Sequence, residues 1–239
     1  MAKFLITTAT GRQGTSTARL LLAKGVEVNA LVRDLASAAS LALSQSMGAA
    51  LFEGGFNDIP ATTAVMQGIN GVFLTGTPRS WTRLAWRARP RPYSPPHVLQ
   101  APLERGQSGL PLPLGAMRNW IVPGVANYFP EYMMLSCLLA VSYTRDFRLK
   151  QLDAVDVGQV AAAALLEPAR FSGVELTLGH EGLPFDEFAA HLSEAIGREI
   201  TLKYRTAEDT AEARKAMSMV EMQLWAPTVP RVEDAELDS

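Results

Sequence analysis

Cysteine is almost absent from this sequence, since Cys137 is the only one among 239 residues. A single thiol cannot form an internal disulfide or a zinc site built from several thiolates. Net charge is also scarce: the formal value of −2 gives no overall attraction to nucleic acid or to an anionic membrane. No apolar run approaches the ~18 residues that a membrane helix needs. We therefore expect a soluble cytoplasmic protein, with the nucleus also open, that binds neither nucleic acid nor membranes.

Residues 1–77 alternate between short apolar runs and helical patterns, which is typical of a parallel sheet with crossover helices. The clearest helical pattern follows the first strand, where Ala18, Leu21 and Leu22 share one face. Asp34 is expected to cap the next helix. The order of elements predicts an α/β fold with a Rossmann-like, doubly wound parallel sheet. The expected strands are residues 3–8, 26–32, 49–53 and 71–75, and the expected helices include 15–24 and 61–67.

The pattern breaks in residues 78–115. More than half of the 15 prolines lie there with many arginines, and Glu104 is the only acidic residue. Because proline interrupts backbone pairing and arginine resists burial, we expect an irregular, mobile segment that leaves the second half of the sheet incomplete. Val98 and Leu99 alone suggest a fifth strand. The arginines fit a solvated loop, an arm that binds an anion or nucleic acid, or a segment that does not fold.

Regular patterns return in residues 116–230, where we expect the remaining Rossmann elements and a small C-terminal α/β lobe. The acidic residues 231–239 are expected to fray. The predicted strands here are residues 147–152, 175–178 and 199–204, and the predicted helices are 155–166, 184–196 and 207–224.

The loop TATGRQG, residues 8–14, follows the first predicted strand and opens the first predicted helix. Glycines let a backbone approach a ligand closely, and free amides at a helix N-terminus attract a pyrophosphate. A glycine pair alone is a weak signal, but the strand, loop, helix and strand around it predict a dinucleotide site. Thr8 and Thr10 belong to this candidate site, and Thr8 stands where the fingerprint has its first glycine.

Arg33 and Asp34, at the end of the second predicted strand, bear on the choice of cofactor. An acid there would hold the ribose 2′-hydroxyl of NAD, whereas an arginine would hold the 2′-phosphate of NADP. Asp34 has the spacing for NAD but is also the expected helix cap. Arg33 and Arg12 can form a guanidinium clamp on the extra phosphate. We therefore predict NADP(H) as the cofactor.

The loop TATGRQGT, the LVRD of residues 31–34 and the GVFLT of residues 71–75 resemble the NmrA-like family of atypical short-chain dehydrogenases. Residues 119–121 and 152–158 are similar to that family too. The resemblance implies a Rossmann domain that prefers NADP and a small C-terminal lobe. It also implies the following cofactor contacts: Gly11, Arg12, Gln13 and Gly14 with the phosphates, Arg33 with the 2′-phosphate, and Thr75 and Thr77 with the nicotinamide-side ribose.

Three features depart from the family pattern. Thr8 replaces a glycine, and Gly55-Phe56 replaces an acidic residue after the third strand. The Pro/Arg-rich residues 78–115 replace a helix, a strand and a further helix, as a deletion, a misread exon or a shifted frame would.

Catalytic groups are hard to find in the sequence. It contains no Tyr-x-x-x-Lys pair, the proton donor of short-chain enzymes. The isolated lysine of isoflavone-reductase-like relatives would fall in the segment without lysine. His97, His180 and His191 lack metal-ligand spacing, and the apolar run around Cys137 indicates an inert buried thiol. The catalytic residues therefore stay unknown from the sequence, and we predict no metal site.

Three functions fit these observations. The first is a nucleotide-sensing regulator whose NADP(H) occupancy alters contact with a protein partner. The second is an NADPH-dependent oxidoreductase that acts on a small carbonyl, quinone or imine, the cofactor supplying the hydride. The third is a degenerate copy that binds no cofactor. The partner is thus a small-molecule substrate or a protein, and a homodimer remains open.

Overall fold

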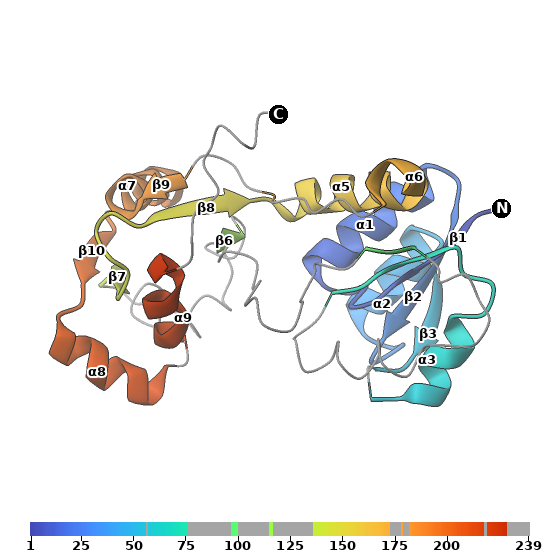
Figure 1. Ribbon diagram of the computed structural model, residues 1–239, viewed down its shortest axis with the longest axis horizontal. Coiled ribbons are helices and arrows are strands. Elements are labelled where there is room, and N and C mark those ends of the chain that lie inside the picture. Colours follow the sequence, from blue (N-terminus) through green and yellow to red (C-terminus); the bar gives the residue numbers. More distant parts are fainter. Residues whose placement is uncertain are drawn as a thin grey trace. The chain divides into compact units, whose positions relative to one another are not determined.

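The computed structural model describes residues 1–55, 57–75, 97–99, 115–116, 136–172, 178, 182–217 and 219–228. The chain divides into two compact units (Figure 1). The first joins Met1–Pro102 with Ala154–Glu175, and the second joins Leu103–Asp153 with Leu176–Ser239.

A five-stranded parallel sheet forms the centre of the first unit. Phe4 of its middle strand lies opposite Val28 on one side and Gly71 on the other. The strand order β3-β2-β1-β4-β5 is that of a doubly wound sheet whose winding reverses between β1 and β4. The Rossmann-like α/β fold is confirmed, as is the fifth strand suggested at Val98 and Leu99. The strands are β1 (Lys3–Ile6), β2 (Glu27–Val32), β3 (Ala50–Glu53), β4 (Gly71–Phe73) and β5 (His97–Leu99).

Helices lie on both faces of this sheet. Helix α1 (Arg12–Ala23) and helix α5 (Ala154–Leu166) pack side by side on one face (Figure 1). Their apolar residues share a core with Phe4, Ile6 and Val28 of the strands. On the other face, Val65 at the end of helix α3 (Ile59–Val65) packs with Leu5 and Leu31. Three short elements complete the described unit: α2 (Ala38–Leu41), the π-helix η1 (Ala42–Ser46) and α6 (Pro168–Phe171).

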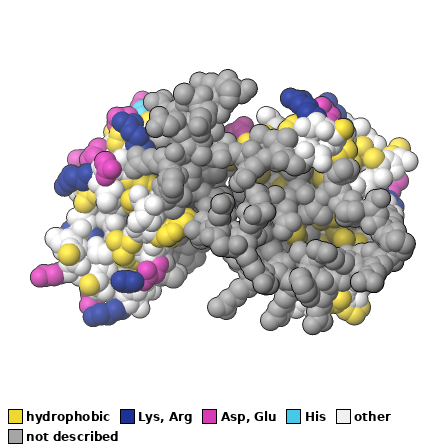
Figure 2. Space-filling view, in the orientation of Figure 1, with side chains coloured by type: hydrophobic (Ala, Val, Ile, Leu, Met, Phe, Trp, Pro, Cys, Tyr) yellow, Lys and Arg dark blue, Asp and Glu magenta, His cyan; other side chains and the backbone are white. Residues whose placement is uncertain are grey.

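The second unit is a small α/β lobe. Strands β7 (Leu138–Val141) and β10 (Thr201–Tyr204) pair in parallel, and a second sheet has the order β6-β8-β9. Helix α7 (Phe185–Ile196) buries Phe185 and Phe188 in the hydrophobic core of this unit. On the face that Figure 2 shows, basic and acidic side chains are interspersed over the described surface. The other elements are β6 (Gly115–Ala116), β8 (Arg148–Leu152), β9 (Gly182–Pro184), α8 (Ala207–Ala216), α9 (Met219–Trp225) and the 3-10 turn η5 (Ala226–Thr228).

The helix predicted over residues 207–224 is in fact two helices. Helix α8 ends at Ala216, and Met217 takes an extended conformation with φ −131° and ψ 105°. The break lets helix α9 bury Val220 and Gln223 completely, whereas α8 buries none of its residues. The exposed segment and the buried segment therefore form separate helices on either side of Met217.

Several sequence predictions fall outside the described residues. They include Thr77, the tail 231–239, most of the segment 78–115 and residues 175–177 of a predicted strand, whose described residue Leu178 is not in a strand. Across the described parts of the chain, no helix is both long enough and apolar enough to span a membrane.

Candidate functional site

The predicted cofactor contacts gather at one edge of the first unit's sheet. The loop 8–14 follows β1, Arg33 follows β2, and Thr75 comes two residues after β4. Because β1 is hydrogen-bonded to both β2 and β4, the carboxyl ends of these parallel strands meet at the same edge. A dinucleotide binds at such an edge, where the winding reverses.

The loop is wound tightly around the carbonyl oxygen of Thr8. The backbone N–H of Gly11 donates to this oxygen at 2.8 Å. A Cβ at Gly11 would lie 3.1 Å from the same oxygen, and one at Gly14 would lie 2.5 Å from it and 2.9 Å from the Cα of Ala9. Glycine at position 14 is therefore required for the loop to rest on the helix.

The N-terminus of α1 is left without a side-chain cap. Gly11 is the N-cap residue, no side chain caps the helix, and the first turn carries no acidic residue. The backbone N–H of Thr15 donates to Gly11 O at 2.8 Å, so the amides of the first turn come before the first hydrogen bond within the helix. Such amides, with the helix dipole, favour an anion. Thr10, Arg12 and Gln13 beside them are exposed.

Thr7 continues the pairing of β1 with β4 beyond both strand ends. Its backbone N–H and its hydroxyl each donate to Phe73 O at 3.0 Å, and the hydroxyl accepts from the backbone N–H of Thr75 at 3.1 Å. Thr7 is completely buried. Thr7 was not among the predicted site residues, although a threonine closing an apolar strand was a signal for it. Its bonds fix the backbone of Thr75 beside the loop.

Asp34 does not cap the helix that follows it, and that prediction was wrong. Helix α2 starts at Ala38, and Ser37 caps it by accepting from the N–H of Ser40 at 3.2 Å. Asp34 instead forms a turn in which its Oδ1 accepts from the N–H of Ala36 at 2.8 Å. The side chain of Arg33 is exposed and forms no ion pair with the described residues.

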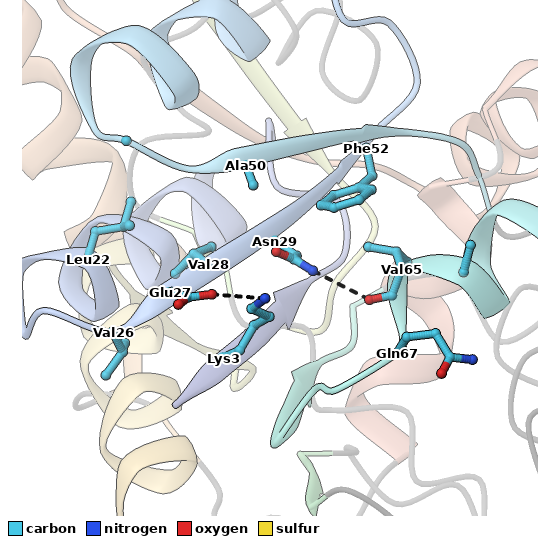
Figure 3. Close-up of a pocket in the computed structure, with 12 residues that line it drawn as sticks. Lys3, Leu22, Val26, Glu27, Val28, Asn29, Ala50, Phe52, Val65 and Gln67 are labelled. Atoms are coloured by element: carbon cyan, nitrogen blue, oxygen red, sulfur yellow. Dashed lines mark hydrogen bonds and ion pairs between the residues drawn. The ribbon is translucent and has the colours of Figure 1, made fainter. Parts of the chain in front are cut away.

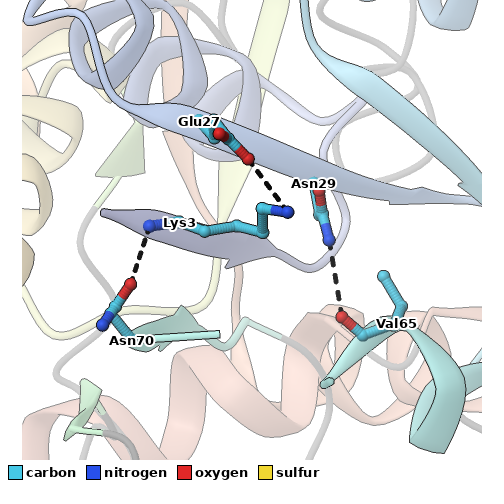
Figure 4. A network of polar contacts seen from close by, with 5 residues as sticks. All are labelled: Lys3, Glu27, Asn29, Val65 and Asn70. Atoms are coloured by element: carbon cyan, nitrogen blue, oxygen red, sulfur yellow. Dashed lines mark hydrogen bonds and ion pairs between the residues drawn. The ribbon is translucent and has the colours of Figure 1, made fainter. Parts of the chain in front are cut away.

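A cavity of about 400 Å³ lies at the opposite edge, where the strands begin (Figure 3). Lys3 and Glu27, the first residues of β1 and β2, form an ion pair there at 2.9 Å, and Lys3 holds the pKa of Glu27 below its ordinary value by hydrogen bonding and charge. Lys3 N donates to Asn70 Oδ1 at 2.8 Å, and Asn29 Nδ2 to Val65 O at 3.5 Å (Figure 4). This network joins β1 to β2 and to the residue before β4, and β2 to the end of α3. None of residues 8–14 lines the cavity.

Two tyrosines are described, and both lie in the second unit. Tyr143 is buried, and desolvation raises its pKa well above the ordinary value. The hydroxyl of Tyr204 donates to Asp186 Oδ2 at 3.2 Å, and the Arg145 guanidinium lies 4.4 Å above its ring. Cys137 is buried as predicted. The described residues contain no cluster of three or more histidine, cysteine, aspartate or glutamate side chains that could hold a metal ion.

Comparison with known proteins supports the resemblance stated above. Residues 2–83 match the NmrA-like family, which confirms the resemblance over the loop and strands β1 to β4. No curated protein matches the sequence.

Among solved structures, the chain is similar to NmrA, a negative transcriptional regulator in complex with NAD, at 19% identity over 92% of this chain and 81% of that one, with a TM-score of 0.63. It is similar to an NADPH-dependent quinone oxidoreductase from Escherichia coli in complex with NADPH, at 16% identity over 94% and 87%, with a TM-score of 0.60. It is also similar to isoflavone reductase, at 15% identity over 98% and 91%, with a TM-score of 0.58. The chain thus has the fold of these proteins, two of which were solved in complex with NAD or NADPH.

Proposed function

We propose that this protein binds NADP(H) at the loop after β1 and acts as a nucleotide-sensing regulator, whose occupancy alters its contact with a protein partner. The observation that carries the proposal is the uncapped N-terminus of α1 at the reversal of the sheet, with Gly14 keeping the backbone clear. These features supply backbone donors where a pyrophosphate would lie. They favour nucleotide binding over a degenerate copy.

The surroundings of Arg33 support NADP(H) over NAD(H). One carboxylate oxygen of Asp34 is engaged by its own turn, which weakens it as a partner for a ribose 2′-hydroxyl. Arg33 is exposed at the same edge as the loop, and a guanidinium matches the oxygens of a 2′-phosphate.

The tyrosines support a regulator over a strong catalyst. Tyr143 is enclosed in a core, and Tyr204 is bonded to Asp186. Neither has a lysine four residues later, so neither has the partner that lowers a phenol pKa for proton transfer. NmrA, a negative transcriptional regulator, has the same fold.

A second candidate is NADPH-dependent reduction of a small carbonyl, quinone or imine. The observation that favours it is the shared fold with an NADPH-dependent quinone oxidoreductase. A quinone accepts hydride readily, so the cofactor would carry the chemistry while the protein orients the substrate.

The test is a calorimetric titration of NADPH and NADH into the wild-type protein and Arg33→Ala. We expect the wild type to prefer NADPH, and Arg33→Ala to lose about tenfold to a hundredfold in NADPH affinity with little change for NADH. Arg19→Ala, an exposed arginine within α1, is the matched control and should bind as the wild type does.

Other outcomes decide between the candidates. Equal wild-type affinities for NADPH and NADH contradict the NADP assignment, and absence of binding supports the degenerate copy. Rapid NADPH oxidation with a panel of quinones, aldehydes and ketones supports the oxidoreductase.

A further inference from the structure

Thr8 and Thr75 join their side-chain hydroxyls across the point where the sheet reverses its winding. The two residues are 67 positions apart in the sequence, and the pair is exposed to solvent. A hydroxyl has one proton to donate and can also accept. One of the two hydroxyls therefore donates its proton to the other.

Thr8 also holds an unfavourable backbone conformation. Its φ is +49°, in the left-handed region, and Cys137 is the only other described residue besides glycines with a positive φ. A β-branched side chain is a genuine outlier in that region. Such strain persists only where surrounding contacts hold it, and it is common at ligand-binding sites.

The strained conformation aims the Thr8 carbonyl at the loop. This oxygen accepts from Gly11 N at 2.8 Å and is the atom against which Gly14 rests. If Thr8 relaxed to a negative φ, its carbonyl would turn away from the loop. The hydrogen bond from Gly11 N and the contact with Gly14 would then be lost. The Thr75 hydroxyl is the side-chain contact that opposes this relaxation, because Thr75 is itself fixed through Thr7.

We infer that the Thr8–Thr75 hydroxyl pair positions the loop of residues 8–14 for binding a phosphate. The pair takes the place of the glycine of the dinucleotide-binding fingerprint, whose conformational freedom Thr8 lacks. This inference rests on the proposed nucleotide binding. The pair holds the loop ready before the ligand arrives, so binding does not have to order it.

The test is a double-substitution cycle on NADPH affinity. Thr75→Val removes the hydroxyl at nearly constant shape and should weaken binding about tenfold, the effect of one lost side-chain hydrogen bond. Thr8→Gly adopts the left-handed conformation without strain, so Thr75→Val added to Thr8→Gly should cost less than about twofold. Thr75→Ser keeps the hydroxyl and should restore binding, and Thr63→Val, an exposed threonine on α3, is the matched control.

Hydrogen exchange without nucleotide gives an independent reading. Thr75→Val should speed exchange in peptides covering residues 7–15, and Thr8→Gly should reverse the change. Unchanged affinity and exchange in Thr75→Val overturn the inference, as does an equal loss in the Thr8→Gly background. The two proposals can fail separately. If the wild-type protein binds no nucleotide but the variants show the expected exchange differences, the proposed function is contradicted and the positioning role is supported.

Discussion

The rings of Tyr143 and Phe147 are stacked, with centroids 4.6 Å apart and planes 8° from parallel. Phe185 stacks on Tyr143 as well, at 4.8 Å and 22°. This cluster leaves Tyr143 only 6% exposed. Desolvation therefore raises the pKa of its phenol above the ordinary value of 10.

Alkaline stability will depend on Tyr143. Below pH 10 the phenol is neutral in both states, whereas above it the unfolded phenol ionises and the folded one stays neutral, so stability is lost as pH rises at up to about 1.4 kcal/mol per pH unit. Urea unfolding from pH 9 to 11.5 should show a shallower loss for Tyr143→Phe. Tyr204→Phe should change the slope less, because that phenol is more exposed. Identical slopes for wild type and Tyr143→Phe would contradict the prediction.

Gly14→Ala will damage the loop. Its Cβ would meet the Thr8 carbonyl oxygen at 2.5 Å and the Ala9 Cα at 2.9 Å, and these backbone atoms cannot move aside cheaply. We expect about 1 to 3 kcal/mol lower stability and at least a tenfold weaker NADPH affinity. Gly55→Ala is the control, since a Cβ there meets nothing within 4 Å. If both variants bind NADPH alike, the close approach at Gly14 is not needed.

Gly158→Ala will separate two helices. A Cβ on Gly158 of α5 would lie 2.4 Å from the Oγ and 2.8 Å from the Cβ of Ser16 on α1. Thermal unfolding should show a loss of about 1 to 3 kcal/mol. Adding Ser16→Gly removes two of the three nearest atoms and should recover part of this loss. A Gly158→Ala variant as stable as the wild type would show that the helices can move apart freely.

Any NADPH oxidation will not depend on a tyrosine acid. A general acid is worth about 10² to 10⁴ in rate, so its removal is easily detected. Replacing Tyr143 or Tyr204 with phenylalanine should leave rates on a quinone panel within about threefold, and the same holds for Tyr128 and Tyr132, which lie outside the described residues. A hundredfold drop in one variant with NADPH binding intact would identify a catalytic tyrosine.

Local pattern was enough to locate the strands and the longer helices of the first unit. The spacing of Ala18, Leu21 and Leu22 located α1, and Ala18 and Leu21 are indeed completely buried. The helix starts at Arg12 rather than residue 15, because Gly11 ends the loop and acts as its N-cap. The loop and Arg33 could be assigned to one edge because parallel strands align their ends.

Contacts between distant residues could not be predicted in the same way. The bond between Thr8 and Thr75 depends on the pairing of β1 with β4, which no pattern within the loop records. Asp34 was predicted to cap the next helix, but Ser37 caps it. The chain forms a turn after Asp34, so α2 begins three residues later than a cap at Asp34 would place it. The break at Met217 accompanies the complete burial of Val220 and Gln223, which the pattern within residues 207–224 did not reveal.

The first unit's core is completed by a helix encoded late in the chain. Ala161 and Leu165 of α5 share one core with Ala18 and Leu21 of α1. A nascent chain is synthesised at about 5–20 residues per second. Helix α5 is therefore made many seconds after α1, and only then can it pack against α1. During that time the part of the apolar face of α1 that α5 will cover stays exposed. Expressed alone, Met1–Pro102 should therefore bind a hydrophobic dye that the full chain does not bind.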